Sequence, residues 1–149
     1  MIRRAVSGDE RDLDGVAKVF LAAREQAARE GWIPPVLGSA QSVRGFLGRA
    51  FAADEVWVDE VDGQIVAMMV LTPGWVNHLY VHPDRARRGV GAALLQLAKS
   101  REPPLQLWTF QANQPARAFY ARHGFAEVEF TDGATNMERA PDVRLVWSG

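Results

Sequence analysis

The segment between residues 75 and 110 constrains the fold most strongly, because it changes from strand to helix and back to strand within a short stretch. Trp75–Val81 reads as a β-strand, the apolar residues of 89–100 recur at helical spacing, and Leu105–Phe110 reads as a second strand. A strand, a helix and a strand in this order predict a right-handed parallel crossover. In such a unit a ligand binds at the carboxyl end of the first strand, against the N-terminus of the helix. We therefore expect the functional site there.

The segments on either side of this crossover predict antiparallel strands and further helices. Strands over 55–59 and 64–71 are joined by an Asp-Gly pair, which is a strong hairpin signal. The other expected elements are strands over 2–6, 125–131 and 143–147 and three helices: one from the turn at 7–9 to about 30, one from Ser39 onward and one over 115–123. The predicted fold class is α+β, an α/β three-layer arrangement with a mixed, mostly antiparallel sheet and one parallel β-α-β crossover.

Composition and charge disfavour several classes of function. The 149 residues fit one domain over 1–149, and 17 Lys and Arg against 18 Asp and Glu leave a net charge of -1, which disfavours nucleic acid as a partner. The sequence has no cysteine, so it offers no thiolate nucleophile and no sulfur ligand for zinc, and its three histidines lack metal-ligand spacing. No apolar run is long enough to cross a bilayer. We expect a soluble, cytoplasmic protein that has no metal and no membrane partner.

The turn after Val81 has the features of an anion-binding site. Gly89 and Gly91 carry no Cβ, so a ligand can approach the backbone closely, and the amides of the first helical turn point at it. Three arginines add positive charge beside these amides: Arg85, Arg87 and Arg88. A dinucleotide fingerprint would need a third glycine where this chain has Leu94, and the Gly-Lys-Ser/Thr of a P-loop is absent. The turn therefore predicts a pyrophosphate site of another kind.

A further set of residues extends from this turn past the second strand of the crossover. In order and spacing they are Val81 with Pro83, Gly89 with Gly91, Asn113, Ala116, Phe119-Tyr120 and Gly124-Phe125. With these residues the chain resembles the GNAT superfamily of acyl-CoA-dependent N-acetyltransferases. The specific motifs lie between residues 75 and 125, and the expected order of strands and helices resembles the fold of the superfamily throughout. One departure is Ala86, which stands where the family has Arg or Gln.

The resemblance implies acetyl-CoA as co-substrate and an amine as the acceptor. The backbone of Leu79, Tyr80 and Val81 would pair with the pantetheine arm and polarise the thioester carbonyl through an amide. Asn113 would hydrogen-bond the same arm, and Ala116 would form part of its wall. The backbone of the glycine turn would hold the pyrophosphate, through Ala86, Arg87, Arg88, Gly89, Val90, Gly91 and Ala92.

The catalytic residues follow in part from the same resemblance. It places Tyr120 beside the thiol, where its hydroxyl, with a reference pKa of about 10, would serve as the general acid. The acidic base that many family members carry on the two central strands is missing here, and His78 is the only imidazole on either strand. Strand alternation puts His78 on the face opposite to Asn77 and Leu79. We therefore expect either His78 or a water ordered by Asn77 to take the proton of the amine.

The acceptor and the assembly are less determined by the sequence. A direct transfer to a primary amine of a small molecule, a peptide or a protein is the leading hypothesis, and a CoA-binding module without turnover is the alternative. Acidic residues in the last loop would favour a cationic acceptor, namely Asp132, Glu138 and Asp142, and Trp32 is the best aromatic candidate for an acceptor pocket. Pairing of edge strands between two subunits would make a homodimer. The acyl-chain preference stays open.

Overall fold

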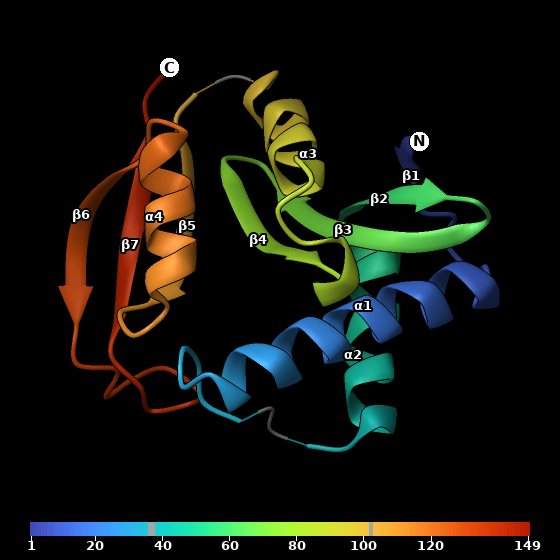
Figure 1. Ribbon diagram of the computed structural model, residues 1–149, viewed down its shortest axis with the longest axis horizontal. Coiled ribbons are helices and arrows are strands. Elements are labelled where there is room, and N and C mark those ends of the chain that lie inside the picture. Colours follow the sequence, from blue (N-terminus) through green and yellow to red (C-terminus); the bar gives the residue numbers. More distant parts are fainter. Residues whose placement is uncertain (36–37, 102) are drawn as a thin grey trace.

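A seven-stranded sheet forms the centre of the computed structural model, which describes residues 1–35, 38–101 and 103–149. The strands are β1 (Ile2–Arg4), β2 (Glu55–Val61), β3 (Gln64–Thr72), β4 (Trp75–Val81), β5 (Leu105–Phe110), β6 (Ala126–Thr131) and β7 (Asp142–Trp147). The helices are α1 (Glu10–Arg29), α2 (Ala40–Ala53), α3 (Val90–Lys99) and α4 (Gln114–Arg122), with a 3-10 turn η1 (Pro83–Arg85) before α3. Figure 1 shows how the helices surround the sheet.

The sheet confirms the predicted fold class. Its strands lie in the order β1-β2-β3-β4-β5-β7-β6, in which β4 and β5 are parallel and the other neighbours are antiparallel. The chain passes from β4 to β5 through α3, which makes the predicted parallel crossover. The β2–β3 hairpin turns at Asp62 and Gly63, whose φ angles of 52° and 77° are those of the Asp-Gly turn expected between antiparallel strands.

The bounds of β4 and β5 agree with the sequence, whereas the ends of several other elements differ. The first strand ends before residue 6 because the amide of Val6 donates to the carboxylate of Asp12 at 2.8 Å rather than to a neighbouring strand. The first helix begins directly after the predicted turn over residues 7–9, because Asp9 caps it. The Asp9 carboxylate accepts hydrogen bonds from the amides of Arg11 and Asp12 at 2.9 and 3.1 Å. This cap sets where α1 starts.

Alternate residues of β3 pack on opposite faces of the sheet and so build two cores. Met68 and Val70 lie against α1 and α2, whereas Ala67 and Met69 lie against α3 and α4, and each of the four is at most 1% exposed. Helices therefore cover both faces of the sheet around β3 and β4 (Figure 1). The site described below lies where residues from both cores meet beside β4.

Candidate active site

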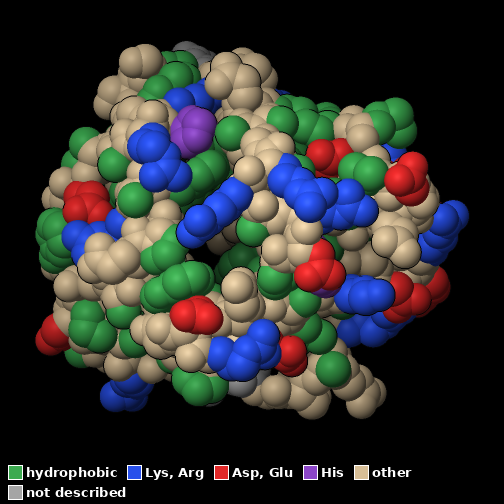
Figure 2. Space-filling model, in the orientation of Figure 1, with side chains coloured by type: hydrophobic (Ala, Val, Ile, Leu, Met, Phe, Trp, Pro, Cys, Tyr) green, Lys and Arg blue, Asp and Glu red, His purple; other side chains and the backbone are tan. Residues whose placement is uncertain are grey.

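A cleft opens between β4 and β5 because these parallel strands pair only where they begin. Within the described residues their register holds the single pair Trp75 and Gln106, and the amide of Gln106 donates to the carbonyl of Gly74 at 2.9 Å. Beyond this pair the two strands diverge (Figure 1). Figure 2 shows a hollow near the middle of this face, bordered by hydrophobic and by Lys or Arg side chains. The carboxyl end of β4 thus faces open space, as the sequence predicts.

The edge of β4 that faces the cleft carries backbone groups without a strand partner. His82 N donates to the carbonyl of Val66 at 2.8 Å, which continues the antiparallel ladder between β4 and β3. Because such a ladder alternates, the backbone groups of Tyr80 point toward β3 and those of Leu79 and Val81 point away from it, toward β5. Leu79 and Val81 are therefore placed to bond an extended ligand in the cleft, whereas the backbone of Tyr80 is not.

The N-terminus of α3 presents unbonded amides at the same end of β4. Gly89 is the N-cap, with a φ angle of 78°, and no side chain caps the helix. Ala93 N donates to the carbonyl of Gly89 at 3.0 Å, and the amides of the three residues between them have no acceptor among the described residues. A Cβ on Gly91 would lie 3.4 Å from Val81 Cγ2, so this glycine allows α3 to lie close to β4. These features fit the predicted anion site.

The chain before α3 is exposed to solvent. Ala86, Arg87, Arg88 and Gly89 are all exposed, and Arg87 has a positive φ angle of 64°. The sequence predicts that Arg85 adds positive charge beside the amides of α3, but in the structure it lines a pocket beside α1 instead. Two arginines, Arg87 and Arg88, therefore remain as the side chains nearest in sequence to the unbonded amides.

The fourth helix contributes Asn113 and Tyr120 from the far side of the crossover. Asn113 is the N-cap of α4, and its Oδ1 accepts a hydrogen bond from the amide of Ala116 at 3.3 Å. The Asn113 Nδ2 has no acceptor within the described ranges, so it stays able to donate to a ligand. Ala116 packs against the core that α3 and α4 share.

Tyr120 is almost completely buried, with 8% of the residue exposed. Its ring packs edge-on against Phe119 and Phe125, at centroid distances of 5.2 and 5.5 Å, which fixes its direction. Burial raises the pKa of the Tyr120 hydroxyl well above its ordinary value, and the nearby hydroxyl of Tyr80 raises this pKa further. Tyr120 is therefore a neutral donor at pH 7.

Tyr80 links this donor to the opposite core. Its side chain belongs to the face covered by α1 and α2, and its hydroxyl accepts a hydrogen bond from Nη1 of Arg24 at 3.1 Å. Because Tyr80 affects the pKa of Tyr120, the two phenols lie within electrostatic reach of each other. Tyr80 thus joins Arg24 of α1 to the strand β4.

Comparison with known proteins agrees with this arrangement. A family model described as an acetyltransferase (GNAT) domain matches residues 52–127, about half of the chain, including β4, α3, β5 and α4. The chain belongs to the GNAT acetyltransferase family. It therefore carries an acyltransferase domain, and the matched segment contains the cleft, the unbonded amides of α3 and Tyr120.

Individual GNAT relatives resemble the chain over different lengths. Peptidyl-lysine N-acetyltransferase YiaC of Escherichia coli is 39% identical over 74 residues, which cover 49% of this chain and 51% of YiaC, so the match spans about half of that relative. The uncharacterized N-acetyltransferase YafP of E. coli is 28% identical over 119 residues, covering 79% of this chain and 77% of YafP. The solution structure of apo YjaB from E. coli superposes with a TM-score of 0.77 at 20% identity, covering 100% of this chain and 97% of YjaB.

His78 lies among aromatic rings in this GNAT structure. Its imidazole contacts Phe20 and Phe46 edge-on, at centroid distances of 5.7 and 5.4 Å, and stacks on Tyr80 at 6.0 Å. Burial, and secondarily the positive charge of Arg24, lower the pKa of His78 to about 4. The ring is neutral at pH 7, but a pKa this low makes it a weak base. The geometry thus gives little support to the predicted role of His78 as the general base.

Asn77, the predicted alternative to His78, forms its side-chain hydrogen bond near the start of β4, away from the carboxyl end of the strand. Its Nδ2 donates to Oγ1 of Thr72 at 2.9 Å, close to the point where β4 begins. The side chain is exposed. Ordering of a catalytic water by Asn77 stays a prediction that this contact does not favour.

The acidic residues of the last loop take different positions. Asp132 accepts a hydrogen bond from the amide of Ala134 at 2.9 Å, and Asp142 bonds the side chains of Thr131 and Asn136, so both shape the loop itself. Glu138 instead approaches Nη2 of Arg24 at 3.7 Å. Of the three acids, Glu138 is therefore the one that approaches a buried residue of α1.

Arg24 is a buried charged residue beside Tyr80 that the sequence-based reasoning missed. It follows Val16 and Phe20 at intervals of four residues on the apolar stripe of α1, and it is buried with 9% of the residue exposed. An arginine on a helix stripe that otherwise enters the core is the signal that would have found it. Such an arginine is expected to have a polar partner in the interior.

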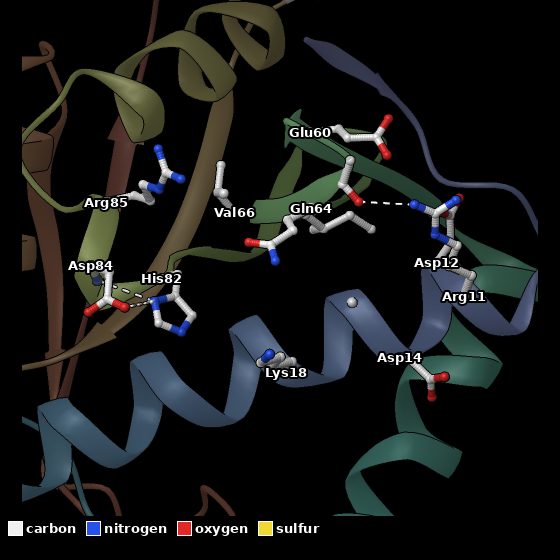
Figure 3. Close-up of a pocket in the computed structure, with 13 residues that line it drawn as sticks. Arg11, Asp12, Asp14, Lys18, Glu60, Gln64, Val66, His82, Asp84 and Arg85 are labelled. Carbon is white, nitrogen blue, oxygen red and sulfur yellow. Dashed lines mark hydrogen bonds and ion pairs between the residues drawn. The ribbon is translucent and has the colours of Figure 1, made fainter.

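A separate pocket of about 460 Å³ lies on the outer side of the turn, between α1, the β2–β3 hairpin and η1 (Figure 3). Figure 3 shows Lys18 of α1 and His82, Asp84 and Arg85 of the turn around it. His82 Nδ1 accepts a hydrogen bond from the amide of Asp84 at 3.2 Å, which gives this imidazole a structural role in the turn. Groups of both charge signs line the pocket, and it lacks Tyr120 and the unbonded amides of α3.

Two further findings concern the described residues as a whole. They contain no group of three or more His, Asp or Glu side chains placed to hold a metal ion. None of their helices has the length and apolar character needed to cross a membrane.

Proposed function

We propose that this GNAT protein transfers the acetyl group of acetyl-CoA to the primary amine of a small molecule or of a peptide or protein. The observation that carries the proposal is a set of three kinds of hydrogen-bond donor, of which the first two lie at the carboxyl end of β4. They are the unbonded amides at the start of α3, the open backbone edge at Leu79 and Val81, and the hydroxyl of Tyr120. A pyrophosphate needs the first, an extended amide-containing arm needs the second, and a departing thiolate needs the third.

The proposed transfer needs no covalent enzyme species. The neutral amine attacks the thioester carbon directly, so that a C–N bond forms while the C–S bond breaks. An amide on the open edge of β4 stabilises the negative charge that develops on the carbonyl oxygen. Tyr120, which burial keeps protonated, donates a hydrogen bond and then its proton to the leaving sulfur.

The proton that the amine loses has two candidate acceptors. His78 is neutral at pH 7 and can accept it, but a pKa of about 4 makes this a slow route. Water at the open cleft is the competing acceptor of that proton. We expect Tyr120 to matter more for turnover than His78.

The acceptor, the location and the assembly also belong to the proposal. YiaC is by name a peptidyl-lysine N-acetyltransferase, which makes a protein lysine one candidate acceptor for this chain. A cytoplasmic location and the absence of metal, nucleic-acid and membrane partners stay predictions from the sequence. A homodimer stays a prediction too, and β6, an edge strand that exposes Val128 and Phe130, is one place where two copies would pair.

Release of the CoA thiol during incubation with amines tests the proposed function. The chain has no cysteine, so a thiol reagent reports CoA without background from the protein. We expect acetyl-CoA and a suitable amine to give steady thiol release, and Tyr120→Phe to slow it by about 100-fold with unchanged acetyl-CoA affinity, as is typical of a lost general acid. Acetyl-CoA binding without turnover on any amine would instead indicate a CoA-binding module.

A further inference from the structure

Arg24 is a buried cation that the donor side of the reaction does not use. It lies in the second half of α1, and 9% of the residue is exposed. Buried charges in folded proteins are normally paired and hydrogen-bonded, because removing a charge from water without compensation is costly. The surroundings of Arg24 therefore indicate what it binds.

The guanidinium is only partly satisfied by its neighbours. Nη1 donates to the Tyr80 hydroxyl at 3.1 Å, and the group lies over the ring of Phe20 at 5.5 Å. Nη2 is 3.7 Å from Oε1 of Glu138, which is an ion pair but too long for a hydrogen bond. The Nε is fully buried and has no hydrogen-bond partner among the described residues. The Nε and Nη2 edge, which can bind a carboxylate with two parallel hydrogen bonds, thus lacks a bonded acceptor.

Arg24 lies beside β4, on the side of the sheet that α1 covers. Arg24 contacts Tyr80, and Tyr80 in turn lies within electrostatic reach of Tyr120, the proposed acid. The helix that carries Arg24 covers the face of the sheet opposite to α3, whose amides would hold the pyrophosphate (Figure 1). An acceptor that binds Arg24 would therefore approach from the side of α1 and of the loop that holds Glu138.

We propose that Arg24 binds a carboxylate of the acceptor, so that the acceptor is a small amine that also carries a carboxylate, such as an amino acid. This inference rests on the proposed acetyl transfer. In the structure described here the Glu138 carboxylate approaches the same guanidinium, and it is displaced when the carboxylate of the acceptor forms two hydrogen bonds to Nε and Nη2. Glu138 lies in a loop, at residues 132–141, and makes no other ion pair within the described residues.

A cation at this point also favours the reactive form of the amine. The positive charge of Arg24 already contributes to the low pKa of His78, so it acts on basic groups in this part of the molecule. An amine held nearby would experience the same repulsion in its protonated form, which increases the neutral fraction that can attack. This effect lessens the need for a strong general base, which β4 and β5 do not provide.

Paired acceptors separate this inference from the proposed function. Glycine, β-alanine and 4-aminobutyrate are compared with glycinamide and n-butylamine, which lack the carboxylate, and with a lysine-containing peptide amidated at its C-terminus. We expect the amines with a carboxylate to have the higher kcat/KM. Arg24→Gln should lower that kcat/KM by about 30- to 100-fold, which is typical of lost hydrogen bonds between charged groups. The kcat/KM for amines without a carboxylate and the Kd for acetyl-CoA should change less than about threefold, within ordinary surface-mutation effects.

Matched variants identify the cause of any loss. Arg29→Gln removes an exposed arginine from the last turn of the same helix and should leave every parameter unchanged. Glu138→Gln keeps Arg24 and removes its competing carboxylate, so it should raise kcat/KM for the amines with a carboxylate. If the ion pair were purely structural, Glu138→Gln would instead lower the unfolding temperature without that gain. Arg24→Lys keeps the charge and loses the planar fork, so it should show an intermediate loss even if Arg24→Gln fails to fold.

Direct binding of the same compounds distinguishes the two ways in which the account can fail. Calorimetric titration of the amino acids into the wild type and into Arg24→Lys gives their affinity without turnover. Weaker binding to the variant, with no acetylation of any amine by the wild type, would support the carboxylate site and refute the proposed function. Acetylation of glycinamide or the peptide as efficient as that of glycine, with equal losses in Arg24→Lys, would refute the carboxylate site and leave the proposed function standing. Neither binding nor transfer would overturn both.

Discussion

Replacing His78 with phenylalanine tests whether this imidazole is a buried neutral ring rather than a catalytic base. The pKa of His78 lies at about 4, against an ordinary value of 6.5, because Phe20, Phe46 and Tyr80 surround it and Arg24 repels its charged form. The unfolded chain therefore binds a proton at His78 as the pH falls below 6.5, whereas the folded protein does so only near pH 4. Neutral His78 therefore makes its full contribution to the free energy of unfolding above pH 6.5, and this contribution is lost progressively as the pH falls toward 4.

The magnitude follows from the same pKa difference. Each tenfold change in proton affinity corresponds to about 1.4 kcal/mol. The free energy of unfolding should therefore fall by about 2 kcal/mol between pH 7 and pH 5 because of His78. In urea this corresponds to a fall in the unfolding midpoint of about 1 M for a small domain. Phenylalanine keeps the aromatic contacts and cannot titrate, so the fall should be smaller by that amount in His78→Phe. Turnover at pH 7 should fall less than threefold, because a base with so low a pKa contributes little.

Urea unfolding curves at pH 7 and pH 5 measure how much the unfolding midpoint falls in the wild type and in His78→Phe. Protonation of carboxylates affects both proteins equally, so it cancels when the two falls are compared. His123→Gln is the control, because His123 lies away from Phe20, Phe46 and Tyr80. The pKa of His123 is also lowered, mainly by partial burial and then by Lys99 and Arg122. This variant should therefore keep the pH dependence that His78 causes. An equal pH dependence in the wild type and His78→Phe would refute the buried neutral ring. A large loss of kcat in His78→Phe that follows an apparent pKa near 7 would restore His78 as the general base.

Two further substitutions test the anion site and the ion pair between Arg3 and Asp12. Gly89→Ala should destabilise the protein by about 1 kcal/mol, because Gly89 has a φ angle of 78° with no neighbour to obstruct a Cβ, and it should weaken acetyl-CoA binding severalfold. Gly8→Ala, at a φ angle of 81° and equally open, is the matched control that should lose the same stability in urea and keep its acetyl-CoA affinity; equal affinities in both variants would contradict the site. Asp12→Asn should cost about 2 kcal/mol in urea unfolding, because it breaks a partly buried ion pair in which Asp12 accepts two hydrogen bonds from Arg3 at 2.9 and 2.8 Å. The wild type should lose this stability only below about pH 4, since that pairing lowers the pKa of Asp12, and a loss above pH 5 would argue against the ion pair.

The parts of the fold that the sequence predicts are those specified by neighbouring residues. The strand β4 and the strand β5 have the predicted bounds because each is a short apolar run between turn-forming residues. Ser39 caps α2 as expected, with its Oγ accepting the amide of Ser42 at 3.1 Å. The insertion of β7 between β5 and β6 could not be predicted, because strand order depends on contacts between segments distant in the chain.

In the candidate site, too, the residues specified by local sequence could be predicted, whereas those that depend on tertiary contacts could not. The glycine turn, Asn113 and Tyr120 follow from local spacing and from the family resemblance, and the matched family segment contains all of them. The environment of His78 depends on Phe20 from α1 and Phe46 from α2, which meet it only in the folded chain. Arg24 becomes buried for the same reason, when α1 packs on β4. Local patterns therefore indicate the donor side of the site better than the acceptor side.

Calorimetric titration of the protein with acetyl-CoA, with NAD as the control nucleotide, tests the central claim most directly. The unbonded amides of α3 and the open edge of β4 predict binding of acetyl-CoA on the micromolar scale, about -8 kcal/mol, and no binding of NAD. Absence of acetyl-CoA binding at millimolar concentrations, or equal affinity for both nucleotides, would contradict the account of this cleft as the site of acetyl transfer.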